Sequence, residues 1–348
     1  MVIEFRPGIF NNDFKSFNHL FQICTHRNRY EIYADYISIK DSENFKRLDV
    51  TDKELLALSF DAQMTKQSSK KIKGRAVSNA DYYVDSNATN ENNVFGIEEA
   101  LAFFNQKVAI ILENSHHDAY FIKALIKYFD SNGKLRAHLA NNWITFDNAG
   151  GCTNVENHIA EKLLEFNELP KDNKYYYRAF VLLDSDRKSP QELIDQKHKK
   201  LLKFLIDNNV VFHILEKRMM ENYMPEDVIK DYSDVNTKDW INAYAYLTKR
   251  QKDFIDFTKG FSKKDHEGAP LKSRTELDQS VQELFASVSN TNFTILDIGF
   301  KLSHFKNKFP ANFIENGKVN ATSLKEMINH QDNPDEYKDI IDKIAKLL

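Results

Sequence analysis

The sequence contains little cysteine, glycine or proline. Among its 348 residues there are 2 cysteines, 10 glycines and 7 prolines. Two thiols cannot form the disulfide framework of a small secreted domain, and Cys24 and Cys152 lack the paired spacing of a zinc site. So few glycines and prolines exclude a collagen-like or low-complexity chain. We therefore expect a folded, reduced, cytoplasmic protein.

The sequence also lacks a strong net charge and a long apolar run. Its 48 Lys and Arg residues are balanced by 51 Asp and Glu residues, a net charge of −3. A nucleic-acid partner would therefore need a local basic patch or bound metal ions. Residues Met1–Arg6 do not resemble a secretory signal, and the apolar run Val108–Leu112 is far shorter than the roughly 20 residues that span a bilayer. We expect no membrane association.

The chain is long enough for more than one domain, because a domain usually has roughly 100–200 residues. Residues 1–95 combine a strand pattern at Tyr30–Ile39 with a short helix at Asp52–Leu58 and predict an N-terminal α+β domain of unknown role. The Asn- and Asp-rich stretch Asn79–Asn93 predicts a loop or linker before the next domain. Residues 232–348 show amphipathic spacing and predict a mostly helical C-terminal region.

Residues 96–231 alternate apolar strands with helices. The four predicted strands are Val108–Leu112, Trp143–Phe146, Ala179–Leu183 and Val210–Leu215. Continuous apolar runs of this kind are typical of parallel strands buried on both faces. The alternation predicts an α/β fold in which a parallel sheet is flanked by helices.

Carboxylates follow three of these four predicted strands. Glu113 follows the first, and Asp184 and Asp186 follow the third. Glu216 follows the fourth, with Glu221 further along. Ligands bind at the carboxyl ends of the strands in an open parallel sheet, and like charges that converge there repel one another unless a cation neutralises them. Oxygen ligands suit Mg²⁺ or Mn²⁺, whereas the alternative is that these acids are solvated loop residues or helix caps.

The order of these residues resembles a Toprim domain. The series is Ile111-Leu-Glu113, Asp118-Ala-Tyr-Phe, Gly150-Gly151 and Leu183-Asp184-Ser-Asp186. That family has a Glu after the first strand and an Asp-x-Asp after the third. The segment Arg218-Met-Met-Glu221-Asn-Tyr223 further resembles the Arg-x-x-Glu-Asn-Tyr segment of Toprim domains in OLD-family (overcoming lysogenization defect) nucleases. The resemblance covers about residues 105–230 and implies a Toprim, Rossmann-like sheet.

By position, the resemblance implies a metal site made of carboxylates. The implied ligands of Mg²⁺ or Mn²⁺ are Glu113, Asp118, Asp184, Asp186, Glu216 and Glu221. Glu113 would be a metal ligand or a general base. Glu216 and Glu221 would support a second metal or orient the ligands of the first.

Glycines and basic residues are candidates for phosphate contact. Gly150 and Gly151 would let the backbone approach a phosphate closely, because glycine has no Cβ. Lys259-Gly260 resembles a Lys-Gly segment that follows many OLD-like Toprim domains, and a Lys near the metals could stabilise a pentavalent phosphate. The candidates for holding a nucleic-acid backbone are Lys70, Lys71, Lys73 and Arg75. The alternative for each lysine is an ordinary solvated surface position.

The resemblance implies a metal-dependent nuclease that hydrolyses phosphodiester bonds of DNA or RNA, tRNA included. OLD nucleases carry an ATPase before the Toprim domain, whereas residues 1–95 stand there in this chain, and the sequence has no Gly-x-x-x-x-Gly-Lys-Ser/Thr motif. The closest analogy is an anti-phage defence effector whose ABC- or SMC-like ATPase is a separate protein. The alternative is a catalytically inactive Toprim-like subunit that acts in assembly or sensing, which Glu113-Asn114 favours because the family usually has Glu-Gly there. Assembly into a homo-oligomer stays open.

Overall fold

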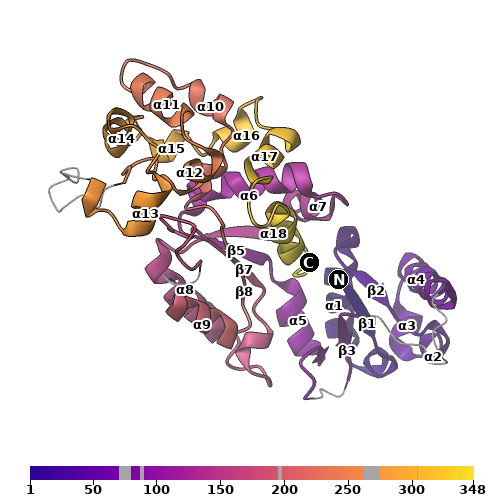
Figure 1. Cartoon of the computed structure of the whole chain (residues 1–348). Coiled ribbons are helices and arrows are strands. Elements are labelled where there is room, and N and C mark those ends of the chain that lie inside the picture. Colours follow the sequence, from indigo (N-terminus) through magenta and orange to yellow (C-terminus); the bar gives the residue numbers. More distant parts are fainter. Residues whose placement is uncertain (70–79, 87–89, 195–197, 262–273, 304) are drawn as a thin grey trace.

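Two parallel sheets form the framework of the protein. The computed structural model describes residues 1–69, 80–86, 90–194, 198–261, 274–303 and 305–348. Within these residues each sheet has four strands, and helices pack against both sheets (Figure 1). The α/β class expected from the sequence is confirmed.

The first sheet is formed by the N-terminal part of the chain. Its strands, in spatial order, are β2 (Glu31–Tyr33), β1 (Val2–Phe5), β3 (Tyr82–Val84) and β4 (Val94–Phe95). All three strand pairs are parallel, whereas the sequence predicts an α+β arrangement. The predicted strand at Tyr30–Ile39 is shorter than expected, because the chain turns into helix α2 (Tyr36–Ile39).

The helices of the N-terminal part build a phenylalanine-rich core on this sheet. They are α1 (Phe14–Thr25), α2, α3 (Glu43–Arg47), α4 (Val50–Ser69) and α5 (Ile97–Asn105). Helix α1 begins at Asp13, whose carboxylate accepts the Ser16 N–H at 2.9 Å. Its residues Phe17 and Phe21 are one turn apart and pack on Phe5 of β1.

The second sheet confirms the four strands predicted in the middle of the chain. In spatial order they are β6 (Ile144–Asn148), β5 (Val108–Leu112), β7 (Ala179–Leu183) and β8 (Val211–Ile214), all parallel. The central strands β5 and β7 are buried at every residue, which explains their continuous apolar sequence. Along β5, Val108, Ile110 and Leu112 belong to one core, whereas Ala109 and Ile111 belong to the core on the opposite face.

Helices cover both faces of the second sheet. One face packs against α8 (Val155–Leu164) and α9 (Lys199–Asp207). The other packs against α6 (Ser115–Phe129) and α18 (Glu336–Ala345), and α7 (Lys134–Ala140) follows α6. The layers therefore leave the carboxyl ends of the strands as the edge at which a site can form.

The described elements after residue 224 are helices. They are α10 (Glu226–Lys230), α11 (Lys238–Ala245), α12 (Lys249–Phe254), α13 (Gln279–Leu284), α14 (Asn290–Asp297), α15 (Phe305–Lys308), α16 (Asn312–Glu315), α17 (Ala321–Ile328) and α18. Their aromatic side chains, among them Phe257, Phe300 and Phe309, join the core on the α6 face. Most of these helices lie at the end of α6 away from the first sheet (Figure 1). Among the described helices, not one has the length and apolar character needed to cross a membrane.

Candidate active site

A pocket of about 270 Å³ lies at the carboxyl ends of β5 and β7. Besides Asp256, five carboxylates line it: Glu113, Asp118, Asp184, Asp186 and Glu221. They come from three places in the sequence, namely the end of β5 with the first turn of α6, the end of β7, and the loop after β8. Since β5 and β7 pair directly, the residues that follow them are brought to one edge.

Backbone hydrogen bonds fix the two segments that carry Asp184, Asp186 and Glu221. The Asp184 carboxylate accepts the Met220 N–H at 3.0 Å, and the Asp186 N–H donates to the Arg218 carbonyl at 2.9 Å. The buried Ser185 hydroxyl donates to the Lys217 carbonyl at 2.7 Å. Asp186 has a φ of 52°, a left-handed conformation that Asp tolerates better than most residues. The Asp-x-Asp turn and the loop that carries Glu221 are therefore held as one unit.

The carboxylates raise one another's pKa. Burial, followed by repulsion from Glu221, Glu113, Asp118 and Asp186, raises the pKa of Asp184 well above its usual range. Burial raises the pKa of Asp118 to about 7, assisted by Glu221 and Glu113 and opposed by a hydrogen bond from the Asn114 N–H. Burial likewise raises the pKa of Glu221. Ionising all of these groups together is therefore costly unless a cation joins them.

The donor set fits a hard divalent cation with water among its ligands. In the described parts of the chain, no three His, Cys, Asp or Glu side chains are gathered as a ready-made metal-binding group. Mg²⁺, however, is usually held by one or two carboxylates, with waters and substrate phosphate as its other ligands. The pocket wall is dominated by carboxylate oxygens, contains one histidine and no cysteine, and so meets that requirement.

A tight turn places Lys259 on the wall of the same pocket. The Asp256 carboxylate accepts the N–H groups of Thr258 and Lys259, both at 2.8 Å, and an antiparallel bridge joins Asp256 to Gly260. Arg218 forms an ion pair with Asp256 at 3.2 Å and so ties this turn to the loop after β8. The expected proximity of Lys259 to the carboxylates is thus seen in the structure.

The pocket wall also includes residues that were not among the expected site residues. Those with polar or charged side chains are Asn114, His117, Asp256, Thr258 and Lys306. Asp256 and Thr258 could have been proposed from the sequence because they lie one to three residues before Lys259. Lys306 gives no local signal, because it reaches the pocket from α15, more than a hundred residues after Asp184.

The structure does not bring Glu216 into this pocket. The Glu216 carboxylate accepts the Asn333 N–H at 3.3 Å, and its own N–H donates to Glu336 at 2.8 Å. Glu216 lines a different hollow, which includes His213 and Lys343. Burial, followed by repulsion from Glu336, raises its pKa to about 7. Glu216 therefore faces the C-terminal helix and not the other carboxylates.

The expected phosphate-contact residues have mixed placements. Gly150 and Gly151 have φ values of 72° and 114°, and their N–H groups donate to Asn148 Oδ1 and to the Glu113 carbonyl, both at 3.1 Å. They lie beside the backbone of Glu113 but are not part of the pocket wall. The candidates Lys70, Lys71, Lys73 and Arg75 lie outside the described residues.

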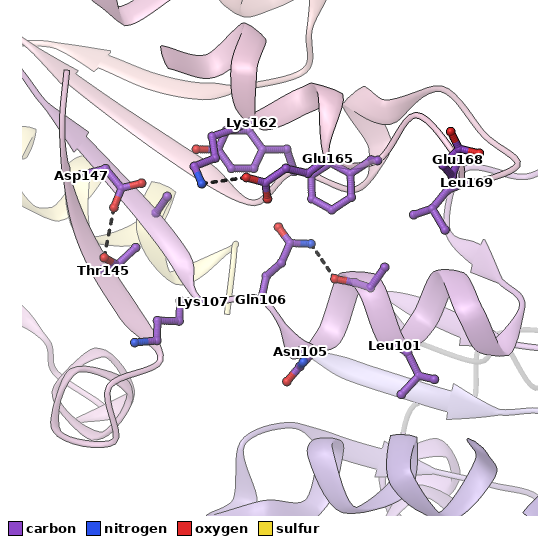
Figure 2. Close-up of a pocket in the computed structure, with 14 residues that line it drawn as sticks. Leu101, Asn105, Gln106, Lys107, Thr145, Asp147, Lys162, Glu165, Glu168 and Leu169 are labelled. Atoms are coloured by element: carbon purple, nitrogen blue, oxygen red, sulfur yellow. Dashed lines mark hydrogen bonds and ion pairs between the residues drawn. The ribbon is translucent and has the colours of Figure 1, made fainter. Parts of the chain in front are cut away.

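A second hollow, of about 440 Å³, contains the acidic residue at the end of β6. Figure 2 shows Asp147 and Thr145 on the strand, Gln106 next to α5, and Lys162 and Glu165 across the hollow. The Thr145 hydroxyl donates to Asp147 at 3.1 Å, and Lys162 pairs with Glu165 at 2.8 Å. Asp147 therefore lines this second hollow and is not part of the wall of the carboxylate pocket.

No known protein family, curated protein or solved structure matches the chain. The fold and the site together describe an α/β protein with an acidic pocket at the carboxyl edge of a parallel sheet. The functional inference therefore depends on this chemistry.

Proposed function

We propose that the protein is a metal-dependent nuclease that hydrolyses phosphodiester bonds of DNA or RNA, with a site of the Toprim type. The observation that carries this proposal is the gathering of Glu113, Asp118, Asp184, Asp186 and Glu221 in one pocket, where burial and mutual repulsion raise the pKa values of Asp184 and Asp118. A divalent cation would relieve that repulsion.

Each group has a role that follows from its position. Asp184 and Asp186 would hold Mg²⁺ or Mn²⁺ together with Glu221, and such an ion would supply an activated water and stabilise the leaving oxygen. A carboxylate that does not bind the metal, Glu113 in our assignment, can accept the proton of the attacking water. Lys259 can stabilise the negative charge of the phosphate as it is attacked.

We further propose that this nuclease is an anti-phage defence effector that works with a separate ATPase. The support is the resemblance of its motifs to OLD-like Toprim domains and the lack of a P-loop motif in the 348 residues. DNA and RNA, including tRNA, are both compatible with the pocket, because its expected contacts are to phosphate.

The proposed function is tested with Asp184→Ala. Wild type and variant are incubated with supercoiled plasmid and with bulk tRNA, in Mg²⁺, Mn²⁺ or EDTA. We expect metal-dependent cleavage of one substrate class by the wild type and at least a hundredfold loss in the variant. Asp147→Ala is the matched control, because Asp147 is also an acidic residue near the carboxyl end of a strand of this sheet but lies in the other hollow. Equal cleavage by Asp184→Ala and wild type would exclude the proposed site.

A second function is a catalytically inactive Toprim-like subunit that acts in assembly or sensing. Among the described residues no three His, Cys, Asp or Glu side chains already have the arrangement of a metal-binding group, and Asn114 follows Glu113 where the family usually has glycine. The two functions differ in metal binding. Thermal unfolding with increasing Mg²⁺ or Mn²⁺ should raise the melting temperature of the wild type but not of Asp184→Ala. A wild type that does not respond to either metal would favour the inactive subunit.

A further inference from the structure

The short helix α15 brings a cation to the pocket from the C-terminal part of the chain. Phe305, Lys306 and Pro310 all line the pocket. Phe305 is buried, and its ring packs on Phe257 at 5.9 Å and on Phe309 at 4.7 Å between ring centroids. The helix is therefore anchored by aromatic packing on the same core that supports the Lys259 turn.

Within the residues that the structure describes, the exposed side chain of Lys306 forms no ion pair or hydrogen bond. Two more deeply buried cations of this region differ, because Arg218 pairs with Asp256 and Lys217 pairs with Asp253 at 2.8 Å. A positive charge is thus left at the mouth of a pocket whose interior is acidic.

We propose that Lys306 binds a backbone phosphate of the nucleic-acid substrate at the mouth of the carboxylate pocket. The inference rests on the proposed nuclease function and deepens it, since it assigns part of the substrate site to the C-terminal part of the chain. A strand whose scissile phosphate lies at the carboxylates must carry its neighbouring phosphates across the wall of the pocket. The ammonium group of a Lys is a mobile point charge suited to such a phosphate.

The electrostatics of the pocket agree with this position. The charge of Lys306 lowers the pKa of Asp118 and of Glu221, against the causes that raise them. Its ammonium group therefore acts on carboxylates that come from α6 and from the loop after β8. Together with Lys259, it gives the acidic pocket a cation on each of two separate segments, the Asp256–Gly260 turn and α15.

Binding without cleavage isolates this role. The probe is a short fluorescent oligonucleotide, made as DNA and as RNA, bound in EDTA to the Asp184→Ala protein over a range of salt concentrations. Adding Lys306→Ala should weaken binding about five- to tenfold at low salt and reduce the slope of log K against log salt by about one, as expected for one lost phosphate contact. Lys306→Arg should restore most of the slope.

Lys308→Ala is the matched control. Lys308 lies on the same helix and is equally exposed, but it is not part of the pocket wall. It should leave the slope closer to that of the parent protein. Equal slopes for Lys306→Ala and Lys308→Ala, or no binding of either oligonucleotide by the parent protein, would overturn the inference.

The nuclease function and the phosphate contact of Lys306 can be contradicted by different results. In the cleavage-competent protein, Lys306→Ala should raise KM by about the factor seen in binding and change kcat less, because a contact to a neighbouring phosphate holds substrate and transition state alike. Cleavage that survives Asp184→Ala would exclude the carboxylate site. A salt slope that does not respond to Lys306→Ala would exclude only the role of Lys306.

Discussion

Asp118 is held in two ways that affect its charge in opposite directions. Its carboxylate accepts the Asn114 N–H at 2.8 Å at the start of α6, which favours the ionised form. It also lies in the acidic pocket, where burial, Glu221 and Glu113 favour the neutral form and raise its pKa from 3.8 to about 7. Burial and repulsion outweigh the hydrogen bond, so Asp118 is only partly ionised at neutral pH, and a bound cation would increase the ionised fraction.

The pH dependence of stability follows from this shift. Between pH 3.8 and about 7, the folded chain keeps a proton on Asp118 that the unfolded chain has lost. The free energy of unfolding should therefore decrease as the pH rises through this window, provided that metal is absent. Added Mg²⁺ should oppose the decrease, because it binds the ionised form.

Asp118→Asn tests this directly. Asn keeps an oxygen that can accept the Asn114 N–H but cannot ionise. At pH 8 in EDTA we expect the variant to be more stable than wild type by roughly 1–3 kcal/mol, since one pKa unit corresponds to about 1.4 kcal/mol and partial exposure screens some of it. Urea unfolding at pH 4, 6 and 8 measures the difference. Equal pH dependence in the two proteins would show that Asp118 does not cause it.

At the scale of structural elements, the Asp256–Gly260 turn depends on two glycines, Gly260 and Gly299. Each of them packs against the backbone of the segment that contains the other. Gly260 and Gly299 have φ values of 62° and 79°, where side chains are disfavoured. A Cβ on Gly299 would lie 2.3 Å from the Thr258 carbonyl oxygen, and one on Gly260 would lie 2.5 Å from the Leu296 carbonyl oxygen. The turn that carries Lys259 can therefore adopt its position only with glycine at both places.

Gly299→Ala should destabilise the protein by about 2–4 kcal/mol, because backbone strain adds to the clash. It should also reduce cleavage, because Thr258 and Lys259 must shift. Gly133→Ala is the control: Gly133 has a similar φ of 72°, but a Cβ there would meet only the end of the Arg136 side chain at 3.6 Å. Its cost should be about 1 kcal/mol, with normal cleavage. Similar stabilities in urea for the two variants would show that the tight contact is unimportant.

The sequence predicts the strands and the carboxylates next to them because both signals are local. A strand buried on both faces must be apolar throughout, and Glu113 and Asp184 directly follow such strands. Tertiary contacts decide what the sequence could not show. Glu216 also follows a strand, yet the hydrogen bonds of its segment are to Asn333 and Glu336, more than a hundred residues away. Lys306 likewise lines the pocket although it lies more than a hundred residues after Asp184.

Across the whole molecule, one buried carboxylate joins the C-terminal helix to the loop that carries Glu221. Glu336 is fully buried on α18, where it accepts hydrogen bonds from the Tyr223 hydroxyl at 2.6 Å and the Glu216 N–H at 2.8 Å. It also lies 3.0 Å from His213 Nε2 on β8. The last helix of the chain is thereby linked to both sides of the segment that bears a pocket carboxylate.

Glu336→Ala should therefore affect both stability and activity. It would leave the Tyr223 hydroxyl and the Glu216 N–H buried without their acceptor, at a cost of about 2–5 kcal/mol. Cleavage should decrease even where the variant is still folded, because the loop that positions Glu221 loses its anchor. Glu336→Gln should be milder, since the amide oxygen can still accept a hydrogen bond.

Asp335→Ala separates this effect from a general change on α18. Asp335 is the neighbouring residue, carries the same charge and is exposed. Urea unfolding and cleavage are measured for all three variants at one temperature. If Glu336→Ala behaves like Asp335→Ala in both measurements, α18 does not support the pocket. If stability decreases but cleavage by the folded fraction does not, the helix stabilises the fold without positioning Glu221, and the C-terminal part of the chain then acts on the site only through α15 and the Asp256–Gly260 turn.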